Sequence, residues 1–236
     1  MLSFTQNERM AMREIVLDTE TTGLDPFSGD KIVEIGCVEL INHVPTGVTY
    51  QKYLNPQRSM SEEVIAVHGL TEEFLSDKPI FEEIADDFLE FIGFDSTLVI
   101  HNAPFDMKFL NCELAAVGRP EIPMARVCDT LVMARQKYPG SQVNLNALCK
   151  RFDIDLSARE KHGALLDSEL LAEVYLELLG GREPSLVLKK EKQTQEPKLE
   201  VKKVTDFPYR NWDILEEDIE QHIDFIKKIQ NNLWQA

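Results

Sequence analysis

Two carboxylates, Asp18 and Glu20, follow the short apolar run Ile15–Leu17 near the start of the chain. Alternate residues of a β-strand point to the same face, so a strand here would set both carboxylates side by side, about 5–7 Å apart. Two like charges at that distance beside an apolar core are costly unless cations bridge them. The pair therefore indicates a divalent-cation site, although a polar strand end with a turn at Gly23 fits the same residues.

Two more acidic residues stand where the chain is expected to enter helices. Asp106 opens a predicted helix after the apolar run Leu98–Ile100, and open α/β sheets place their sites at the carboxyl ends of such strands. Asp167 lies in the first turns of a later helix, and His162 lies in the loop before it. A histidine near a carboxylate–metal cluster suits a general base at neutral pH. Taken singly, the acids also fit first turns favoured by the helix dipole, and His162 fits a surface histidine.

The types of ligand favour magnesium or manganese over zinc, because hard cations prefer carboxylate oxygens. His101, which follows the run Leu98–Ile100, is predicted to form structural hydrogen bonds rather than to bind a metal. The cysteines form no C-x-x-C pair and stand among apolar residues, which is typical of buried thiols in a reducing cytoplasm. They are Cys37, Cys112, Cys128 and Cys149.

The segments that must position these residues alternate between strand-like and helix-like apolar patterns over residues 13–181. Strands are predicted at Arg13–Glu20, Lys31–Ile41, Val48–Leu54 and Leu98–Ile100, with a turn over Asn42–Gly47 and a further strand-to-helix unit beginning at Val127–Thr130. Helices are predicted at Ile80–Ile92, Ala103–Val117, Leu145–Phe152 and Ala164–Leu179. Three antiparallel strands followed by alternating strands and helices predict an α/β fold, a mixed β-sheet flanked by helices.

Signals for the ends of two helices accompany these patterns. Asn102 is a candidate N-cap and Pro104 stands in the first turn of the helix that carries Asp106. Gly180-Gly181 ends the last helix of this region.

Beyond Gly181 the composition changes. Lys189–Lys203 contains six lysines and three glutamates but few large apolar residues, as in a solvated linker. An apolar stripe then returns at helical spacing, with acids in its first turns and Lys227-Lys228 near its end. Its residues are Leu215, Ile219, Ile223, Ile226, Ile229 and Leu233. A lone amphipathic helix cannot bury such a stripe, so we expect it to dock on a partner protein.

These patterns divide the chain into four parts. We expect a disordered N-terminal extension (1–12), a catalytic domain (13–181), a flexible linker (182–211) and a C-terminal helix (212–236). No stretch approaches the roughly 18–20 apolar residues that span a membrane, and residues 1–12 lack the apolar run of a secretory signal. The formal charge of −16 argues against tight autonomous binding to nucleic acid, unless cations occupy the carboxylates.

Several segments within residues 13–181 together resemble the DnaQ-like DEDDh exonucleases. The segments are Asp18-Thr-Glu-Thr-Thr-Gly23, Ile32-Val-Glu-Ile-Gly36, Val67-His-Gly69, His101-Asn-Ala-Pro-Phe-Asp106, Asn144-Leu-Asn-Ala-Leu-Cys149 and His162-Gly-Ala-Leu-Leu-Asp167. The resemblance implies a ribonuclease H-like fold, which fits the predicted order of elements. It also implies a 3′→5′ exonuclease that removes nucleotides from a single-stranded 3′ end of DNA as 5′-monophosphates, by two-metal-ion hydrolysis.

The same resemblance implies roles for individual residues. The implied ligands of two Mg²⁺ or Mn²⁺ are Asp18, Glu20, Asp106 and Asp167, which together with the implied general base His162 form the candidate catalytic set. The implied substrate-binding residues are Asp18, Glu20, Glu63, His68 and Asp167. Glu63 and His68 fall in a Glu-x-x-x-x-His-Gly segment, in which His68 also fits a turn before Gly69. Phe105 and Leu24 are candidates to stack against the terminal base.

The tail most resembles that of the proofreading members of the family. The resemblance implies that the C-terminal helix binds the catalytic (alpha) subunit of DNA polymerase III, with Trp212, Leu233 and Trp234 as anchors. Such tethering would raise the local concentration of DNA ends for an acidic protein. Glu183–Leu188 resembles the Q-x-x-L-x-L peptide that grips the sliding clamp, with Glu183 in place of the expected glutamine.

Two other functions fit parts of the sequence. An RNA exonuclease similar to ribonuclease T or oligoribonuclease would share the catalytic residues, but those enzymes lack a long tail with a terminal amphipathic helix. A catalytically inactive ribonuclease H-like module could bridge polymerase and clamp, but all five implied catalytic residues are present. The sequence therefore favours a proofreading DNA exonuclease.

Overall fold

The computed structural model describes residues 11–157, 159 and 161–181, together with positions 216, 219, 221, 224 and 225. The chain divides into two compact units, Met1–Leu186 and Val187–Ala236. In the second unit the five described positions are helical and exposed. Residues 1–10 of the predicted extension, the linker 182–211 with Glu183–Leu188, and the anchors Trp212, Leu233 and Trp234 lie outside the described residues.

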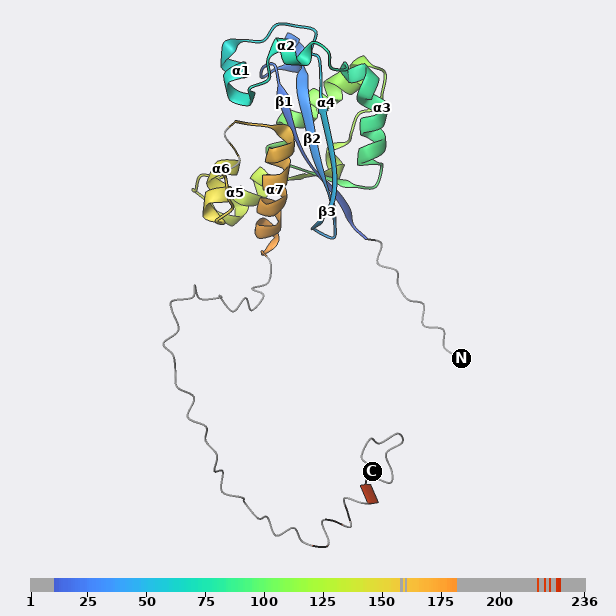
Figure 1. Ribbon diagram of the computed structural model, residues 1–236, viewed down its shortest axis with the longest axis vertical. Coiled ribbons are helices and arrows are strands. Elements are labelled where there is room, and N and C mark those ends of the chain that lie inside the picture. The colour runs from blue at the N-terminus through green and yellow to red at the C-terminus, as the bar shows by residue number, and fades with distance from the viewer. Residues whose placement is uncertain are drawn as a thin grey trace, which may run out of the picture. The chain divides into compact units, whose positions relative to one another are not determined.

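The first unit is built on one mixed sheet, as the order of elements predicts. Its strands are β1 (Arg13–Thr21), β2 (Ile32–Ile41), β3 (Val44–Tyr53), β4 (Thr97–Ile100) and β5 (Val127–Asp129). The order across the sheet is β3-β2-β1-β4-β5. β2 is antiparallel to both β1 and β3, whereas β4 is parallel to β1 and to β5. β1 is therefore the central strand, flanked by a hairpin on one side and parallel strands on the other (Figure 1).

The predicted turn between the second and third strands is too long. The structure turns at Asn42 and His43 alone, both with positive φ (50° and 67°), which is the backbone of a tight hairpin turn. β3 therefore begins at Val44, four residues before the predicted start. Gly47 belongs to β3 near a register shift opposite Val38–Leu40, so this glycine accompanies an irregularity within the strand rather than a loop.

The predicted helices match the structure to within one or two residues. They are α3 (Phe81–Ile92), α4 (Ala103–Ala116), α6 (Leu145–Arg151) and α7 (Ala164–Leu179), and the strand-to-helix unit continues into α5 (Thr130–Lys137). Two short helices between β3 and α3 were not predicted, α1 (Glu62–His68) and α2 (Glu72–Leu75), and two 3₁₀ turns occur at Pro26–Ser28 and Met124–Arg126. Within the described residues, no helix is long and apolar enough to cross a membrane.

Helices cover both faces of the sheet (Figure 1). Ile15 and Leu17 of β1 pack with α3 and α4, whereas Val16, between them, packs with α5, α6 and α7. Because side chains alternate along a strand, Asp18 and Glu20 continue the row of Val16 and face α7. The apolar core thus fixes the face on which the acidic end of β1 appears.

Candidate active site

One pocket of about 190 Å³ gathers all five candidate catalytic residues. It lies where the end of β1 meets the first turns of α4 and α7. Its lining residues are Asp18, Thr19, Glu20, His101, Asn102, Phe105, Asp106, Leu145, Arg159, His162, Asp167 and Leu171. Residues that are up to 149 positions apart in the sequence, Asp18 and Asp167, thereby face a common space.

Asp106 is held in place by the neighbouring residue of β1. Its Oδ1 accepts hydrogen bonds from the Thr19 backbone N–H at 3.1 Å and from the Thr19 hydroxyl at 2.7 Å. Asp106 is buried, so these two donors fix its carboxylate against the end of β1. The face of β1 toward α7 supplies Asp18 and Glu20, while Thr19, whose side chain points to the opposite face, anchors Asp106.

The start of α4 differs in detail from the predicted cap. Asn102 precedes the helix as expected, but its backbone is left-handed (φ 68°, ψ 48°) and its side chain makes no capping hydrogen bond. Asp129, at the end of β5, accepts the Asn102 backbone N–H at 3.2 Å instead. Asparagine suits this position because it tolerates the left-handed conformation better than most residues, so the sharp bend after β4 explains its presence.

The start of α7 is fixed by two residues of β2 to which the sequence pattern gave no role. Buried Glu34 accepts the backbone N–H of Ala164 at 3.1 Å, at the helix N-terminus where an anion is favourable. A Cβ at Gly36 would lie 2.2 Å from the backbone of Ala164, so only glycine lets α7 pack this closely. Ser168 donates to the Gly36 carbonyl at 2.9 Å. These contacts set the position of Asp167. In the sequence, the only signal for them is that Glu34 and Gly36 belong to Ile32-Val-Glu-Ile-Gly36, one of the segments that carry the family resemblance.

Arg159 is the site residue that sequence reasoning missed. Its guanidinium lies against both carboxylate oxygens of Asp167, with Nη2 at 2.5 Å from Oδ2. The same guanidinium contacts Asn146 and His162. Arginine in a loop carries no distinctive spacing, so only the folded structure shows that it approaches Asp167.

The carboxylates of the pocket repel one another in a poorly solvated space. Burial, and then the charges of Asp106, Glu20 and Asp167, hold the pKa of Asp18 well above its ordinary value. Burial, followed by Asp167 and Glu34, raises the pKa of Glu20 to about 8. Burial also raises the pKa of Asp106 to about 7, against the hydrogen bonds from Thr19 that lower it. The ionised forms of these carboxyl groups are therefore disfavoured, because the protein's own donors do not fully compensate their charges.

His162 stands at the exposed side of this cluster. Its side chain is about half exposed, at 48%, and its Nδ1 lies 3.3 Å from Asp167 Oδ2. Ligand atoms of Glu20, His162 and Asp167 all lie within 4.8 Å of one another. The backbone N–H of His162 donates to the Val67 carbonyl at 3.2 Å, which ties its loop to the end of α1.

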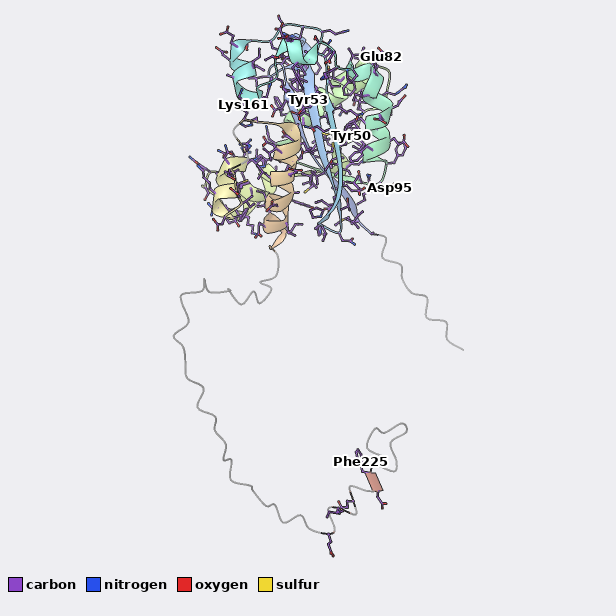
Figure 2. The ribbon with its side chains drawn as sticks, viewed as in Figure 1. Tyr50, Tyr53, Glu82, Asp95, Lys161 and Phe225 are labelled. Carbon is purple, nitrogen blue, oxygen red and sulfur yellow. The ribbon has the colours of Figure 1, made fainter. Side chains whose placement is uncertain are left out.

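Neither His68 nor Glu63 lines the pocket, although His68 lies near Lys161 and His162. His68 is buried; its Nδ1 accepts the Leu70 backbone N–H at 3.0 Å, and its Nε2 has no hydrogen-bond partner. Burial, with Lys161 and His162 nearby, lowers the pKa of His68. Lys161 (Figure 2) lies over Gly69, where an added Cβ would be 2.7 Å from its Cδ. Glu63 is exposed on α1.

Of the other residues singled out in the sequence, His101 and Phe105 line the pocket and Leu24 does not. His101 forms a 2.9 Å hydrogen bond with the Thr130 hydroxyl, as its predicted structural role requires. Phe105 lines the pocket and its ring centroid lies 5.1 Å from that of Phe109. Leu24 is 81% exposed and does not line the pocket. The four cysteines are free thiols, and Cys37 and Cys149 are buried as predicted, whereas Cys112 and Cys128 are only partly buried.

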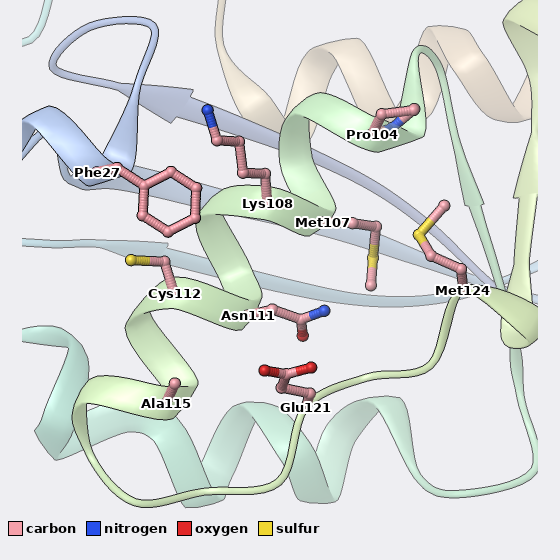
Figure 3. A pocket seen from close by; sticks show the side chains of 9 residues that line it. All are labelled: Phe27, Pro104, Met107, Lys108, Asn111, Cys112, Ala115, Glu121 and Met124. Carbon is pink, nitrogen blue, oxygen red and sulfur yellow. The ribbon is translucent and has the colours of Figure 1, made fainter.

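A second hollow of about 470 Å³ follows the outer side of α4 (Figure 3). Lys108 lies over the ring of Phe27 at its edge, with the ammonium 5.0 Å from the ring centroid. Its lining is mostly apolar, and among the lining residues only Lys108 and Glu121 are charged. None of the five catalytic candidates lines this hollow.

The sheet order and the acidic pocket together define an exonuclease of the DEDDh class with a ribonuclease H-like fold. A family model described as RNase_T, exonuclease, matches residues 15–175. Among solved structures, exonuclease X in complex with 5′-overhanging duplex DNA superposes with a TM-score of 0.54 and 26% identity, covering 70% of this chain and 90% of that one. The residues matched by the family model include all the segments that line the pocket, from β1 to α7.

Curated relatives narrow the family. The DNA polymerase III subunit epsilon of Rickettsia conorii is 59% identical over 176 residues, which cover 73% of this chain and 76% of the relative. That of Rickettsia prowazekii is 49% identical over 225 residues, 93% of this chain and 97% of the relative. The chain belongs to this exonuclease family and, within it, to the epsilon subunits of DNA polymerase III, the proofreading 3′→5′ exonucleases.

Proposed function

We propose that the five residues gathered in the pocket carry out the proofreading reaction of this chain. In this proposal Asp18, Glu20, Asp106 and Asp167 hold two Mg²⁺ or Mn²⁺ ions, and His162 is the general base. The products are 5′-monophosphates released from mispaired 3′ ends of DNA. The observation that carries the proposal is the single pocket lined by all five side chains.

The donor set fits divalent cations of the magnesium type. The four candidate ligands are carboxylates, the oxygen ligands that hard cations prefer, and no cysteine lines the pocket. The raised pKa values of Asp18, Glu20 and Asp106 reflect uncompensated charge, which cations would stabilise in its ionised form. When bound, the ions would supply Lewis-acid stabilisation of the charge that develops on the attacking and leaving oxygens.

His162 is suited to move the proton of the attacking water. It combines a half-exposed ring with a position beside the carboxylate of Asp167, 3.3 Å from Nδ1. Its loop is tied to α1 through Val67, so the base is positioned relative to His68 as well.

The substrate in this proposal is a frayed, single-stranded 3′ end. The pocket is small, so a terminal nucleotide must leave its base pair to enter, and a mispaired nucleotide unpairs at lower cost. Phe105 offers an aromatic surface at the pocket wall on which a base could stack. We assign terminal-nucleotide binding to His68, whose buried Nε2 lacks a protein partner, together with Glu63, Asp18, Glu20 and Asp167. Leu24, exposed beyond the end of β1, is a second candidate contact for the base.

The remainder of the chain attaches this nuclease to the polymerase. We assign 13–181 to catalysis, 182–211 to a linker and 212–236 to binding of the polymerase III alpha subunit in the cytoplasm. The match to the R. prowazekii relative covers 93% of this chain, which is more than the nuclease domain alone. Deletion of residues 205–236 should abolish polymerase association and spare hydrolysis of free single strands.

Clamp binding through Glu183–Leu188 is a separate part of the proposal. The Leu186→Ala/Leu188→Ala pair should weaken clamp binding without changing polymerase association. Unchanged clamp binding by this pair would remove the peptide from the proposal.

One assay tests the central function. The purified chain with Mg²⁺ is given a primer–template with a paired or a mispaired 3′ end, and the released nucleotide is followed over time. Faster release from the mispaired end supports proofreading, and metal-dependent release of any nucleotide rules out an inactive bridging module. Matched DNA and RNA oligonucleotides in the same assay distinguish this function from that of an RNA exonuclease; faster RNA hydrolysis would contradict the proposal.

A further inference from the structure

Arg159 is a buried cation inside the acidic pocket. Its side chain is 7% exposed, and it enters from the loop between α6 and α7. Each of its guanidinium nitrogens hydrogen-bonds within the site: to both oxygens of Asp167, to Asn146 Oδ1 at 2.5 Å, and to His162 Nδ1 at 2.9 Å. The contacts of this side chain are therefore with residues of the site and not with solvent.

The first consequence concerns Asp167. The guanidinium pairs with both of its oxygens, the planar two-point geometry that makes arginine–carboxylate pairs strong. A divalent cation bound to the same oxygens would stand next to a fixed positive charge. Arginine and cation therefore compete for Asp167.

The second consequence concerns His162. A guanidinium only donates hydrogen bonds, so the 2.9 Å contact requires His162 Nδ1 to accept. The contact occupies the lone pair of Nδ1. While Arg159 holds it, this nitrogen cannot accept a proton from water.

We propose that Arg159 is a displaceable counter-ion that holds the metal-free site inactive by occupying Asp167 and His162 together. The inference rests on the function proposed above for the carboxylates. Without cations, Arg159 offsets the repulsion among Asp18, Glu20 and Asp167. Its departure from Asp167 releases His162 in the same movement, so that the base becomes available only when Asp167 has exchanged its partner.

Competition of this kind is reciprocal and therefore measurable as an affinity. The apparent affinity for a cation equals the intrinsic affinity multiplied by the fraction of molecules in which Asp167 is free of Arg159. Titration of the full-length chain with Mn²⁺ by calorimetry should show that Arg159→Gln binds Mn²⁺ about tenfold or more tightly than the wild type, within the usual range of such coupling.

A matched control is Arg119→Gln. It removes the same charge from a two-point pair with Asp86 on the surface, at 2.6 Å, away from the pocket. Its Mn²⁺ affinity should equal that of the wild type. Equal gains in both variants would mean that net charge, and not displacement at Asp167, sets the affinity, and would overturn the proposal.

Thermal unfolding gives an independent readout. In EDTA, Arg159→Gln should unfold at a lower temperature than the wild type, because its carboxylates lose their counter-ion. Saturating Mn²⁺ should close most of that gap. Arg159→Lys, which keeps the charge but not the two-point pairing, should lie between the wild type and Arg159→Gln in both measurements, and it serves should the glutamine variant fail to fold.

The outcomes separate this inference from the proposed function. If Asp18→Asn binds Mn²⁺ as the wild type does, the carboxylate site itself is wrong. If Asp18→Asn loses Mn²⁺ binding but Arg159→Gln and Arg159→Lys bind it with unchanged or lower affinity, the site is right and the displacement of Arg159 is wrong.

Discussion

Both ends of β1 bury a carboxylate against α7, but they provide it with different partners. Near the start of the strand, Glu14 accepts hydrogen bonds from the Tyr175 hydroxyl at 2.7 Å and from the His43 backbone N–H at 3.0 Å. The His43 ring also contacts this carboxylate, with Nδ1 2.9 Å from Oε2 of Glu14. Each oxygen of this fully buried acid thus has a donor from the protein, so Glu14 is structurally satisfied.

At the other end of the strand, acids accumulate without matching donors. Asp18 and Glu20 face the same side as Glu14, about 13 Å and more along β1. They meet Asp167, which lies two turns before Tyr175 on α7. Among the residues that line this pocket, Arg159 is the sole guanidinium or ammonium group.

The comparison shows why burial of a carboxylate is not by itself a sign of function. Burying an acid is tolerable when hydrogen bonds compensate, as at Glu14. Where compensation is left incomplete, pKa values rise and a cation becomes the missing partner. One strand and one helix therefore carry a structurally satisfied acid at one end, the structural end, and the cluster proposed to be catalytic at the other, called the reactive end.

The largest effect should follow removal of a charge from the reactive end. Asp18→Asn should lower turnover by about four orders of magnitude, because the bound metal ions are expected to lower the activation free energy by several kcal/mol. The metal-free variant should unfold at a temperature no lower than the wild type, since repulsion with Glu20 and Asp106 is relieved. Mg²⁺-dependent hydrolysis of a 3′-labelled single strand and unfolding in EDTA measure the two effects. Near-full hydrolysis would refute the assignment of Asp18.

The two histidines beside the buried acids provide the next test. His162→Ala should lower kcat by about 10²–10⁴, the usual contribution of a general base, while Mn²⁺ still binds. His43→Ala, its counterpart beside Glu14, should leave kcat unchanged. Single-turnover kinetics with a 3′-labelled strand compares them, and equal losses in both variants would show that His162 matters only for structure.

The structural end should respond in stability instead. Glu14→Ala leaves the Tyr175 hydroxyl and the His43 N–H without their acceptor, and a buried unsatisfied group costs about 1–3 kcal/mol. Denaturant unfolding should show that loss, with hydrolysis unchanged at a temperature where the variant is folded. Tyr175→Phe should remove part of the same free energy, and the double variant should cost less than the sum of the two. An additive double variant would mean that the two groups do not interact.

The sequence predicted the reactive end better than the structural one. Asp18 and Glu20 could be predicted because a period of two and an apolar run fix their face, and Asp106 and Asp167 because both begin helices. Glu14 has the same spacing from Val16 as Asp18, yet nothing local shows that Tyr175, 161 residues away, would donate to it.

The missed features of the site have a similar origin. Arg159, Glu34 and Gly36 act through contacts between distant segments, such as the 3.1 Å bond from Ala164 to Glu34. The hairpin turn was placed wrongly because Gly47 was taken as a turn residue, whereas the positive φ values fall on Asn42 and His43. Local pattern predicts elements and faces, but hydrogen-bond partners depend on how the elements pack.

The smallest expected effect is a pH dependence of stability that arises at the acidic end of β1. Folding raises the pKa of Glu20 to about 8 and that of Asp106 to about 7, above their ordinary values of 4.5 and 3.8. At pH values between the ordinary and the raised pKa of each group, the folded state binds more protons than the unfolded state. The stability of the metal-free protein therefore falls as pH rises through about 7–8.

Unfolding temperatures in EDTA from about pH 6 to about pH 9 measure this slope. Glu20→Gln should make it shallower, because the amide does not titrate while Asp106 still does. Saturating Mn²⁺ should reverse the slope, since a cation binds the ionised carboxylates and its affinity rises with pH. A metal-free slope that is unchanged in Glu20→Gln would mean that the raised pKa of Glu20 does not contribute to it.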